Sequence, residues 1–549
     1  MMKVWAVPRF LIFLVCKLRS GWYNVVNELL PRGAVTTAIT KASSAVSCIL
    51  KKIAAGMSIV VHPFLYASVP VVGIYGYNMQ ELSISDLAIP LAVALASALA
   101  LFFLSLLAVR NAKRAGIVVT MLVVLFYTYG VVGYLLAPRV RWDPDMLLLP
   151  LWGLLFAVGV VLVMRIRWNT RKLTIILNVA AVSMVLVPAV RIGVGEARRL
   201  DPGSECGVAA IYTQLREPDR SPDIYYIILD SYAGSEYLAD AYGYNNEAFL
   251  DYLGDKGFYV ATASRSNYSS TWLSLASSLN MDYISNLGSE SDMASQYWFS
   301  LTDLVVDNRV MTLLKSVGYK YVCLDTYQDP TERSPRADLE VDVSGSSLSS
   351  FQRVLVEFSM ASAVWHDTVD YREHVLKAFN ELEGMPEVEG PKFVFAHILC
   401  PHWPYVFDAD GGPVDLVDWR QDPERSEKYL DQITFVNKKV ELVIDQILSS
   451  STTPPIIILQ GDHGPRFERS SDNGDPAAAT ARDAHMILNA VYLPQGGAGL
   501  MYESISPVNT FRVVFNYYFG ADLPLLDDES YLSVSRDPFP LVNVSDKLG

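Results

Sequence analysis

The sequence predicts an α/β fold in two parts: an N-terminal α-helical membrane domain of several spans, and a C-terminal domain built on a largely parallel sheet. Two observations predict this division. Long apolar runs fill residues 56–195, and from residue 223 onwards short apolar strands alternate with amphipathic helical stretches. A chain of 549 residues, 51% of them hydrophobic, is long enough for more than one domain and too apolar for an ordinary soluble protein.

The negative charge lies almost entirely in the second part of the chain. The formal net charge is -14, yet few acidic residues precede residue 196. They are Glu28, Glu81, Asp86, Asp143 and Asp145. An acidic C-terminal half argues against a nucleic-acid partner. The five cysteines are scattered without a CxxC spacing, so they predict neither a disulfide framework nor a cysteine-based zinc site.

Residues 1–55 form a mixed N-terminal segment. Trp5–Cys16 is apolar but short, Arg9 interrupts it, and Lys17 and Arg19 follow it. Because no small-residue cleavage site follows, we expect an interfacial or cytoplasmic helix and not a signal peptide.

Five apolar runs within residues 56–195 each approach the roughly 20 residues that cross a bilayer as a helix. They are Met57–Tyr77, Leu87–Val109, Ile117–Leu136, Met146–Met164 and Leu173–Val190. We therefore expect about five transmembrane helices. His62, near the start of the first run, and Arg191, at the end of the last, are expected at the membrane interface, where polar groups reach water.

Basic residues orient these spans. They precede the first run and lie in the connections after the second and the fourth. They are Lys51, Lys52, Arg110, Lys113, Arg114, Arg165, Arg167, Arg171 and Lys172. If the spans alternate, all these positions share one side, which should be cytoplasmic. An odd number of spans then places everything after Val194 outside, although two arginines in Arg139–Asp145 fall on the predicted outer face.

After a polar segment over residues 196–222, which we interpret as a juxtamembrane linker, strands and helices alternate through residues 223–549. The expected strands are Asp223–Leu229, Phe258–Ala261, Tyr319–Leu324, Phe393–Leu399, Ile456–Leu459 and Asn489–Leu493. The expected helices are Asn246–Lys256, Val310–Val317, Ser362–Glu383 and Ser426–Leu448. This alternation predicts a largely parallel sheet whose chemistry lies outside the carboxyl ends of the strands. His366 and His374 fall within one helix and are expected to face solvent.

Two of these strands end in polar residues. The run Ile456–Leu459 leads into Gly-Asp-His-Gly, and the strand Asp223–Leu229 is followed by Asp230. Parallel neighbours would bring Asp230, Asp462 and His463 to the same sheet edge. A carboxylate beside an imidazole suits a divalent ion such as zinc or manganese. The alternative is a turn with a capping aspartate and a chance histidine.

Two further segments carry candidate groups. Ser266–Asn280 begins with small hydroxyl residues and continues as a helix. A hydroxyl at a helix N-terminus is well placed to attack phosphorus, because the backbone N–H groups there favour an anionic substrate. The alternative is a simple N-cap. Phe395–Tyr405 places His397 and His402 at the end of a strand and just beyond it.

Taken in this order, the four segments resemble the alkaline phosphatase/sulfatase superfamily over about residues 223–520, a combination more specific than any one motif. About five spans before an outer domain resemble the lipoteichoic acid synthase and phosphoethanolamine transferase branch. The closing segments Ser506–Arg512 and Tyr517–Gly520 also look like membrane-bound sulfatase-like proteins. The resemblance implies an alkaline-phosphatase-like α/β/α domain outside the cytoplasm, anchored in the plasma or inner membrane.

The resemblance also implies one divalent ion, Mn, Zn or Mg, held by Asp230, Thr271, Asp462 and His463. Thr271 is expected as the nucleophile from its spacing to Ser274. Sulfatases carry a serine three positions after the residue that is modified, and Ser274 stands three positions after Thr271. Sulfatases need a Cys or Ser at this position, followed by Pro and Arg, to make formylglycine. Thr271 lacks that pattern, which favours phosphoryl transfer over sulfate ester hydrolysis. Asp230 also departs from the glutamate common in the transferase branch.

The remaining site residues follow from the same resemblance. His402 matches a substrate-site histidine that could donate to a phosphate oxygen or protonate a leaving alkoxide. Arg466 could clamp phosphate oxygens or be a surface charge, and His485 is a weaker candidate for substrate binding. His397 is expected to be structural or a secondary metal contact. The serines Ser269 and Ser270 stay open as alternative nucleophiles.

The expected function is therefore transfer of a phosphoryl head group from a membrane lipid donor to a glycan or polymer acceptor, or to water, at the outer face. Two alternatives stay open. The first is a hydrolase of sulfuric or phosphonate esters, and the second is a catalytically silent protein of envelope assembly.

Overall fold

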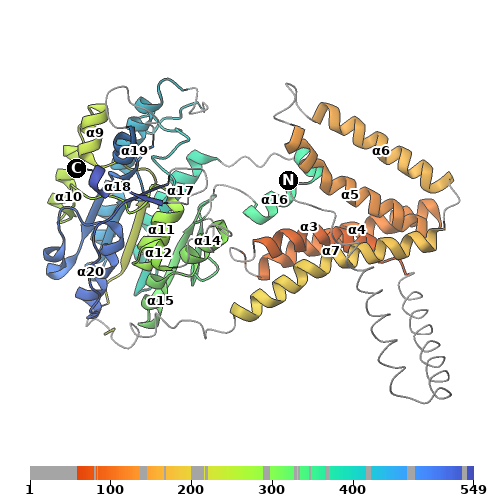
Figure 1. Ribbon diagram of the computed structural model, residues 1–549, viewed down its shortest axis with the longest axis horizontal. Helices are drawn as coiled ribbons and strands as arrows, with labels where there is room; N and C mark the ends of the chain where they lie inside the picture. Colours follow the sequence, from red (N-terminus) through yellow and green to blue (C-terminus); the bar gives the residue numbers. More distant parts are fainter. Residues whose placement is uncertain are drawn as a thin grey trace, which may run out of the picture. The chain divides into compact units, whose positions relative to one another are not determined.

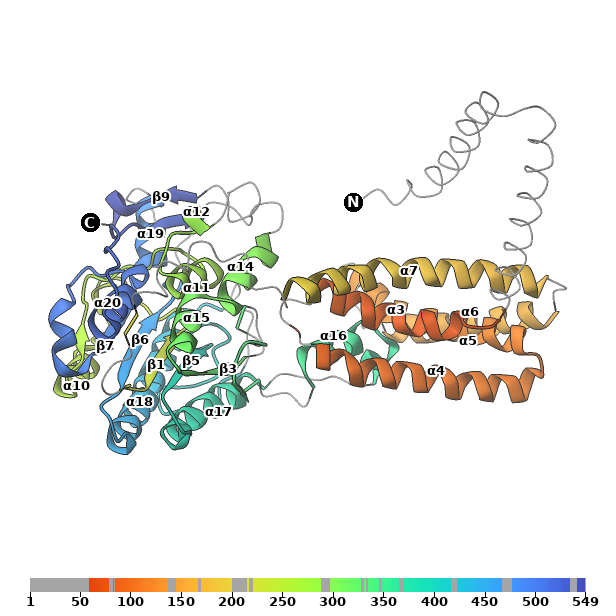
Figure 2. The ribbon, with the colours of Figure 1, turned by 90° about the horizontal axis from the view of Figure 1, so that it is seen from below.

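The structure is a computed structural model that describes residues 59–78, 82, 84–136, 145–165, 169–199, 215–216, 221–287, 297–326, 330–331, 334–344, 348–364, 370–415, 422–466, 476–533 and 541–548. The predicted N-terminal segment, residues 1–55, lies outside these ranges, as does His366. The chain divides into two compact units, one of residues 1–70 with 93–187 and one of residues 71–92 with 188–549. Figures 1 and 2 show their helices and strands.

Long helices make up the N-terminal part of the described chain. They are α3 (His62–Tyr77), α4 (Ala88–Val109), α5 (Ala112–Leu136), α6 (Asp145–Arg165) and α7 (Thr170–Arg199). Four of these, α4 to α7, are long and apolar enough to cross a membrane within the residues described. The helix α3 has 16 residues, which at about 1.5 Å per residue is shorter than a hydrocarbon core of about 30 Å. The multi-span membrane domain is thus present, with four such helices and the shorter α3 where about five spans were predicted.

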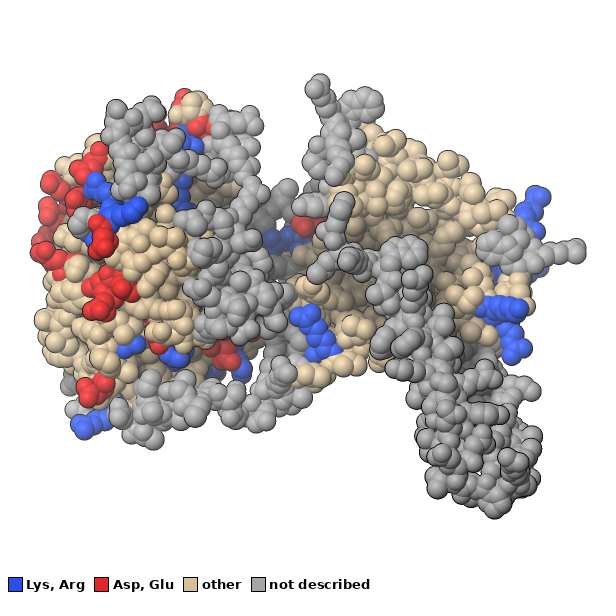
Figure 3. All heavy atoms as spheres, viewed as in Figure 1, with Lys and Arg blue, Asp and Glu red and all other residues tan. Residues whose placement is uncertain are grey.

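The connections between these helices match the predicted basic pattern. On the face shown in Figure 3, Lys and Arg lie toward the ends of the apolar helices and not along their middle, while Asp and Glu lie mainly on the C-terminal domain. Arg110 and Arg114 flank the start of α5, and Arg165 and Arg171 flank the gap between α6 and α7. The last residues of α4 and α6 and the first residues of α5 and α7 lie at the same end of these helices in Figure 2, so the basic residues there share a side, which the orientation argument assumed.

His62 was expected to reach water at the membrane interface, but its side chain is fully buried among the helices. Its backbone N–H donates to Asn178 Oδ1 at 2.9 Å, and its Nδ1 lies 2.5 Å from Thr120 Oγ1. Asn178 also donates to the carbonyl of Ile59 at 2.7 Å. Polar groups inside a helix bundle are retained where they find such partners. Helices α3, α5 and α7 are therefore tied together by neutral hydrogen bonds.

The C-terminal unit is built on a seven-stranded sheet of order β2-β7-β6-β1-β5-β3-β4. Its strands are β1 (Ile224–Leu229), β2 (Tyr259–Val260), β3 (Lys320–Asp325), β4 (Leu339–Asp342), β5 (Lys392–Ile398), β6 (Ile456–Gly461) and β7 (Asn489–Tyr492). The strands β6, β1, β5, β3 and β4 run parallel, whereas β7 and β2 pair antiparallel at one edge. All six predicted strands are present, and the largely parallel sheet is confirmed. The edge strand β4 was not predicted, because its residues are only half-buried and carry no apolar run.

Helices cover both faces of this sheet. The helices described after residue 223 are α9 (Ser235–Tyr242), α10 (Glu247–Asp255), α11 (Thr271–Asn280), α12 (Ile284–Leu287), α14 (Tyr297–Val306), α15 (Arg309–Ser316), α16 (Ser350–Glu357), α17 (Tyr371–Gly384), α18 (Arg425–Ser450), α19 (Pro476–His485) and α20 (Pro507–Phe519). Successive side chains of β1 point to opposite faces. Tyr225 and Ile227 pack with α17 and α18, whereas Tyr226 and Ile228 pack with α11, α14, α15 and α20 (Figure 2). This is the predicted α/β/α layering.

Two predictions about the helices need correction. The expected helix Ser362–Glu383 begins only at Tyr371, where Asp370 caps it by accepting from the N–H groups of Arg372 and Glu373. His374 on this helix is fully buried and not solvated, and its Nδ1 donates to the carbonyl of Val343. Burial lowers the pKa of His374 to about 4, so the ring is neutral at pH 7.

A small second sheet pairs β8 (Tyr531–Ser533) with β9 (Leu541–Asn543), and neither strand was predicted.

Candidate active site

The register of the three central strands brings the predicted carboxylates together. Leu229, the last residue of β1, is paired with Ile398 of β5 and with Gly461 of β6. The next residue on β1 is Asp230, and the next on β6 is Asp462. Both carboxylates therefore leave the sheet at the same edge, between the helix layers. They are almost completely buried.

Two glycines let the Asp462–His463 turn pass close to other backbone. A Cβ on Gly461 would lie 2.4 Å from the carbonyl oxygen of Tyr232, and one on Gly464 would lie 2.0 Å from that of Asp483. Real Cβ atoms do not approach backbone so closely, so both positions need glycine. The two glycines of the Gly-Asp-His-Gly run therefore allow the turn after β6 to pack against the neighbouring backbone.

Asp230, Asp462 and His463 converge, as predicted from the strand ends. His463 Nε2 lies 3.5 Å from Asp462 Oδ2 and 3.9 Å from Asp230 Oδ1. The other ring nitrogen, Nδ1, lies 2.7 Å from the carbonyl oxygen of Gly464. Since a carbonyl only accepts, Nδ1 carries the proton and a neutral ring turns its Nε2 lone pair toward the carboxylates. The oxygen Asp462 Oδ2 has no hydrogen-bond partner in the described part of the chain.

Thr271 is the first residue of α11, and its hydroxyl lies at the same place. Thr271 Oγ1 is 3.2 Å from His463 Nε2. Ser270, the residue before the helix, makes no side-chain capping bond, and its hydroxyl has no hydrogen-bond partner among the described residues. Ser269 Oγ accepts from the backbone N–H of Ser533 at 3.2 Å. Of the three hydroxyls considered from the sequence, that of Thr271 is the one with a recorded contact to His463.

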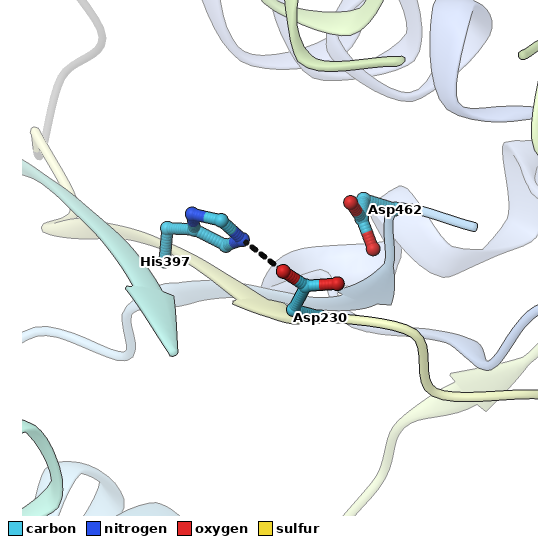
Figure 4. Close-up of side chains that lie close together, drawn as sticks. All are labelled: Asp230, His397 and Asp462. Atoms are coloured by element: carbon cyan, nitrogen blue, oxygen red, sulfur yellow. Dashed lines mark ion pairs between the residues drawn. The ribbon is translucent and has the colours of Figure 1, made fainter. Parts of the chain in front are cut away.

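His397 belongs to this cluster more closely than the sequence suggested. Ligand atoms of Asp230, His397 and Asp462 all lie within 4.8 Å of one another, and Figure 4 shows the three side chains and the ion pair of His397 with Asp230. His397 pairs in register with Ile228, so it lies beside the end of β1. Its place inside strand β5 made it look structural. The signal available in the sequence was a buried-type strand carrying a polar residue next to its end.

The loop after β5 holds His402. The ring Nδ1 of His402 donates to the carbonyl of Trp403, and the side chain is partly exposed. Gln432 on α18 fixes the loop, because its Nε2 donates to the carbonyl of Pro401 at 3.2 Å and its Oε1 accepts from the N–H of Val406 at 2.9 Å. His402 is near enough to Asp230 to lower the pKa of that carboxyl. It therefore stands at the rim of the buried cluster.

The two remaining candidates differ in exposure. Arg466 is exposed, and its guanidinium donates to the carbonyl of Ser269 at 3.1 Å, next to the start of α11. His485 ends α19 and is fully buried. Neither of its ring nitrogens has a hydrogen-bond partner among the described residues. Burial, with a smaller contribution from His463, lowers the pKa of His485 to about 3 and keeps the ring neutral.

Burial and neighbouring charges have opposite effects on the pKa values of the cluster. Desolvation alone would raise the pKa of Asp230, but His402, His397 and His463 outweigh it, and the net pKa is well below its usual range. Desolvation is also the largest influence on His463 and lowers its pKa, although Asp462 opposes that change. Two buried carboxylates that face one imidazole nitrogen are costly unless a cation joins them. The donor set of two carboxylates, imidazole nitrogen and a hydroxyl fits a divalent ion.

No protein-family profile matches the chain, and no curated protein matches it in sequence. Solved structures do match. The C-terminal periplasmic domain of EcEptC from Escherichia coli is 14% identical, covering 60% of this chain and 93% of that domain with a TM-score of 0.41. A structure of the same domain is a complex with Zn.

A match over more of the chain is the integral membrane protein lipooligosaccharide phosphoethanolamine transferase A from Neisseria meningitidis. It is 10% identical, with 86% of this chain and 95% of that one covered and a TM-score of 0.39. The lipoteichoic acid synthase LtaP from Listeria monocytogenes is 14% identical, covering 59% and 82% with a TM-score of 0.37. These are the kinds of protein that the sequence motifs resemble. The likeness is one of fold, so the roles of residues here are argued from their geometry.

Proposed function

We propose that the protein is a membrane-anchored, metal-dependent enzyme that transfers the phosphoryl head group of a membrane lipid, with Thr271 as nucleophile. The observation that supports this most directly is the convergence of a helix-terminal hydroxyl, an imidazole and two carboxylates at one sheet edge. Thr271 Oγ1 lies 3.2 Å from His463 Nε2, which itself lies 3.5 Å from Asp462 and 3.9 Å from Asp230.

The proposed ion ligands are Asp230, Thr271, Asp462 and His463. A divalent ion bound there supplies positive charge that lowers the pKa of the threonine hydroxyl and polarises a phosphoryl oxygen. Residues around the ligands fix their orientation. Ser231 donates its backbone N–H to Asp462 Oδ1 at 3.0 Å and its hydroxyl to Asp230 Oδ1 at 3.0 Å. One carboxylate oxygen of each aspartate is thereby positioned by the same residue.

In the first proposed step, Thr271 Oγ1 attacks phosphorus. A bond from Oγ1 to phosphorus forms, the bond from phosphorus to the diacylglycerol oxygen breaks, and the hydroxyl proton leaves to solvent. His402, at the rim, gives a proton to the departing alkoxide. The N-terminus of α11 and the Arg466 guanidinium place positive charge beside the phosphoryl oxygens, and His485 offers a neutral ring to them.

In the second proposed step, an alcohol of a glycan or polymer acceptor, or water, attacks the phosphothreonine. A bond from the acceptor oxygen to phosphorus forms and the bond between phosphorus and Oγ1 breaks. The acceptor's proton passes to His402, and the Thr271 oxygen takes up a proton from solvent in place of the one lost in the first step. The apolar helices hold this site at the membrane, which raises the effective concentration of a lipid donor. The proposed location outside the cytoplasm needs an odd number of spans, and therefore needs the short helix α3 to cross together with α4 to α7; the basic connections predict the same orientation.

The test is to trap the intermediate. The full-length protein in detergent is incubated with mixed phospholipid vesicles and a divalent ion, and the peptide that contains residue 271 is weighed by mass spectrometry. We expect a head-group phosphate adduct on Thr271 and release of diacylglycerol. Thr271→Ala should lower turnover by at least about 1,000-fold without unfolding the protein, whereas the matched Ser270→Ala protein should keep both activity and adduct.

Three outcomes would contradict the proposal. Full activity in Thr271→Ala, or an adduct on Ser270, would reject the nucleophile. Faster cleavage of aryl sulfates than of phosphodiesters would make the protein a sulfate ester hydrolase. A purified chain that binds no divalent ion and turns over neither ester would instead support a silent assembly protein.

A further inference from the structure

The four proposed ligands leave one buried imidazole of the cluster without a role. His397 has 2% of its surface exposed, and its Nε2 has no hydrogen-bond partner among the residues that the structure describes. Nε2 lies 3.5 Å from Asp230 Oδ2, which is too long for a good hydrogen bond. The ring therefore points a nitrogen at the carboxylate at ion-pair distance, the contact drawn in Figure 4, but beyond the length of a good hydrogen bond.

The other ring nitrogen is held by a defined partner. His397 Nδ1 lies 2.7 Å from Thr331 Oγ1. A histidine that binds a metal through one nitrogen usually has the other fixed by an oxygen, which sets the tautomer and the ring orientation. If Thr331 Oγ1 accepts from Nδ1–H, the Nε2 lone pair is directed into the space between Asp230 and Asp462.

The short side chain of Asp230 brings the shared ion toward His397. An aspartate carboxylate stands one methylene closer to its strand than a glutamate carboxylate would. An ion bound to Asp230 therefore lies close to the end of β1, and His397 is on the neighbouring strand β5 at the register position of Ile228. Ligand atoms of Asp230, His397 and Asp462 already lie within 4.8 Å of one another.

We propose that His397 is a fifth ligand of the divalent ion, bound through Nε2, and that Thr331 fixes its tautomer. The inference rests on the metal site of the proposed function and changes its chemistry. Two imidazoles on opposite sides of Asp230 favour Zn²⁺ or a similar transition-metal ion over Mg²⁺, because nitrogen ligands suit the former and oxygen ligands the latter.

The test measures metal binding directly, not turnover. The full-length protein in detergent is stripped with a chelator, and its Zn²⁺ affinity is measured by competition with a chromophoric chelator. Co²⁺ is then added and the visible absorption is recorded, since band position and intensity report the number and type of ligands. His397→Ala should weaken Zn²⁺ binding by about 100-fold and change the Co²⁺ spectrum, and Thr331→Val should weaken it by about 10-fold.

Two further variants keep the result interpretable. His374→Gln removes a buried imidazole on α17 outside the ligand cluster, and should leave Zn²⁺ affinity and the Co²⁺ spectrum unchanged. Asp230→Glu moves the carboxylate outward, so the loss of affinity caused by His397→Ala should be smaller in that background. Thr331→Val keeps the imidazole and serves if His397→Ala does not fold, as judged by circular dichroism.

The outcomes separate the two proposals. Wild-type protein that binds Zn²⁺, with His397→Ala binding it equally and giving the same Co²⁺ spectrum, overturns the fifth ligand and leaves the four-residue site in place. Wild-type protein that binds no divalent ion overturns both. An equal effect of His397→Ala in the wild-type and Asp230→Glu backgrounds would also contradict a ligand role that depends on the short carboxylate.

Discussion

Buried polar side chains serve different purposes in the two parts of this chain. Among the apolar helices, uncharged side chains form hydrogen bonds from one segment to another. The side chain of Asn178, for example, bonds the backbone of His62 and of Ile59. At the carboxyl edge of the sheet, Asp230 and Asp462 instead face imidazoles, and Asp462 Oδ2 has no hydrogen-bond partner among the described residues. Burial of unsatisfied charge is costly, and it persists where a ligand or ion compensates. This difference is one reason why we propose chemistry at the sheet edge and anchoring by the helices.

Removal of the divalent ion is the strongest test of this contrast. An ion that binds only the folded C-terminal domain at 1,000 times its Kd contributes about 4 kcal/mol to the free energy of unfolding. EDTA should therefore lower the melting temperature of that domain in calorimetry and leave the transition of the apolar helices in place. Asp462→Asn should abolish the EDTA effect. Equal shifts of both transitions would break the comparison.

Acidification should weaken the C-terminal domain through His374. Burial lowers the pKa of His374 to about 4 in the folded state, against 6.5 when unfolded. The unfolded chain therefore binds the extra proton between these values, and stability is lost as the pH falls from 6.5 toward 4, by up to about 3 kcal/mol. His374→Gln should flatten this part of the profile in urea unfolding at several pH values. A slope equal to that of the wild type would show that other groups account for it.

Tyr429 on α18 should matter for the shape of the metal site. Its hydroxyl donates to the carbonyl of Ser231 at 2.7 Å and accepts from the N–H of Ala233 at 3.1 Å, which holds the turn after Asp230. Tyr429→Phe leaves both backbone groups buried and unpaired, so we expect a loss of about 2 kcal/mol in stability and weaker Zn²⁺ binding. Tyr252→Phe, whose hydroxyl bonds the surface residue Asp445, is the matched control. Unchanged Zn²⁺ affinity in Tyr429→Phe would make that tyrosine purely structural.

The smallest effect is expected in the membrane helices. Asn178→Leu removes two hydrogen bonds, and such bonds in membrane proteins average about 0.6 kcal/mol each. Unfolding in mixed micelles should become easier by about 1 kcal/mol, while phospholipid turnover per folded molecule stays the same. Ser183→Ala removes a hydroxyl that donates to the carbonyl of Val179 in the same helix, and should change neither. A large loss of turnover in Asn178→Leu would give these helices more than an anchoring role.

Sequence by itself determined the apolar helices, the parallel strands and the polar ends of β1 and β6. Those features are local, since the length of an apolar run and the residues that follow it can be read without knowing the fold. The Gly-Asp-His-Gly run and the serine-rich start of α11 were visible for the same reason. Their expected roles remain proposals, but the structure does bring Thr271, Asp462 and His463 together.

Only the tertiary structure decided which other side chains meet them. His397 was expected to be structural or a secondary metal contact, and only the pairing of β5 with β1 sets it beside Asp230. Thr331 had no signal at all. His374 was expected to face solvent and His62 to reach water at the membrane interface, although both are buried. Register between strands distant in sequence, and the packing of helices over them, fix these contacts. No periodicity within a single segment records them.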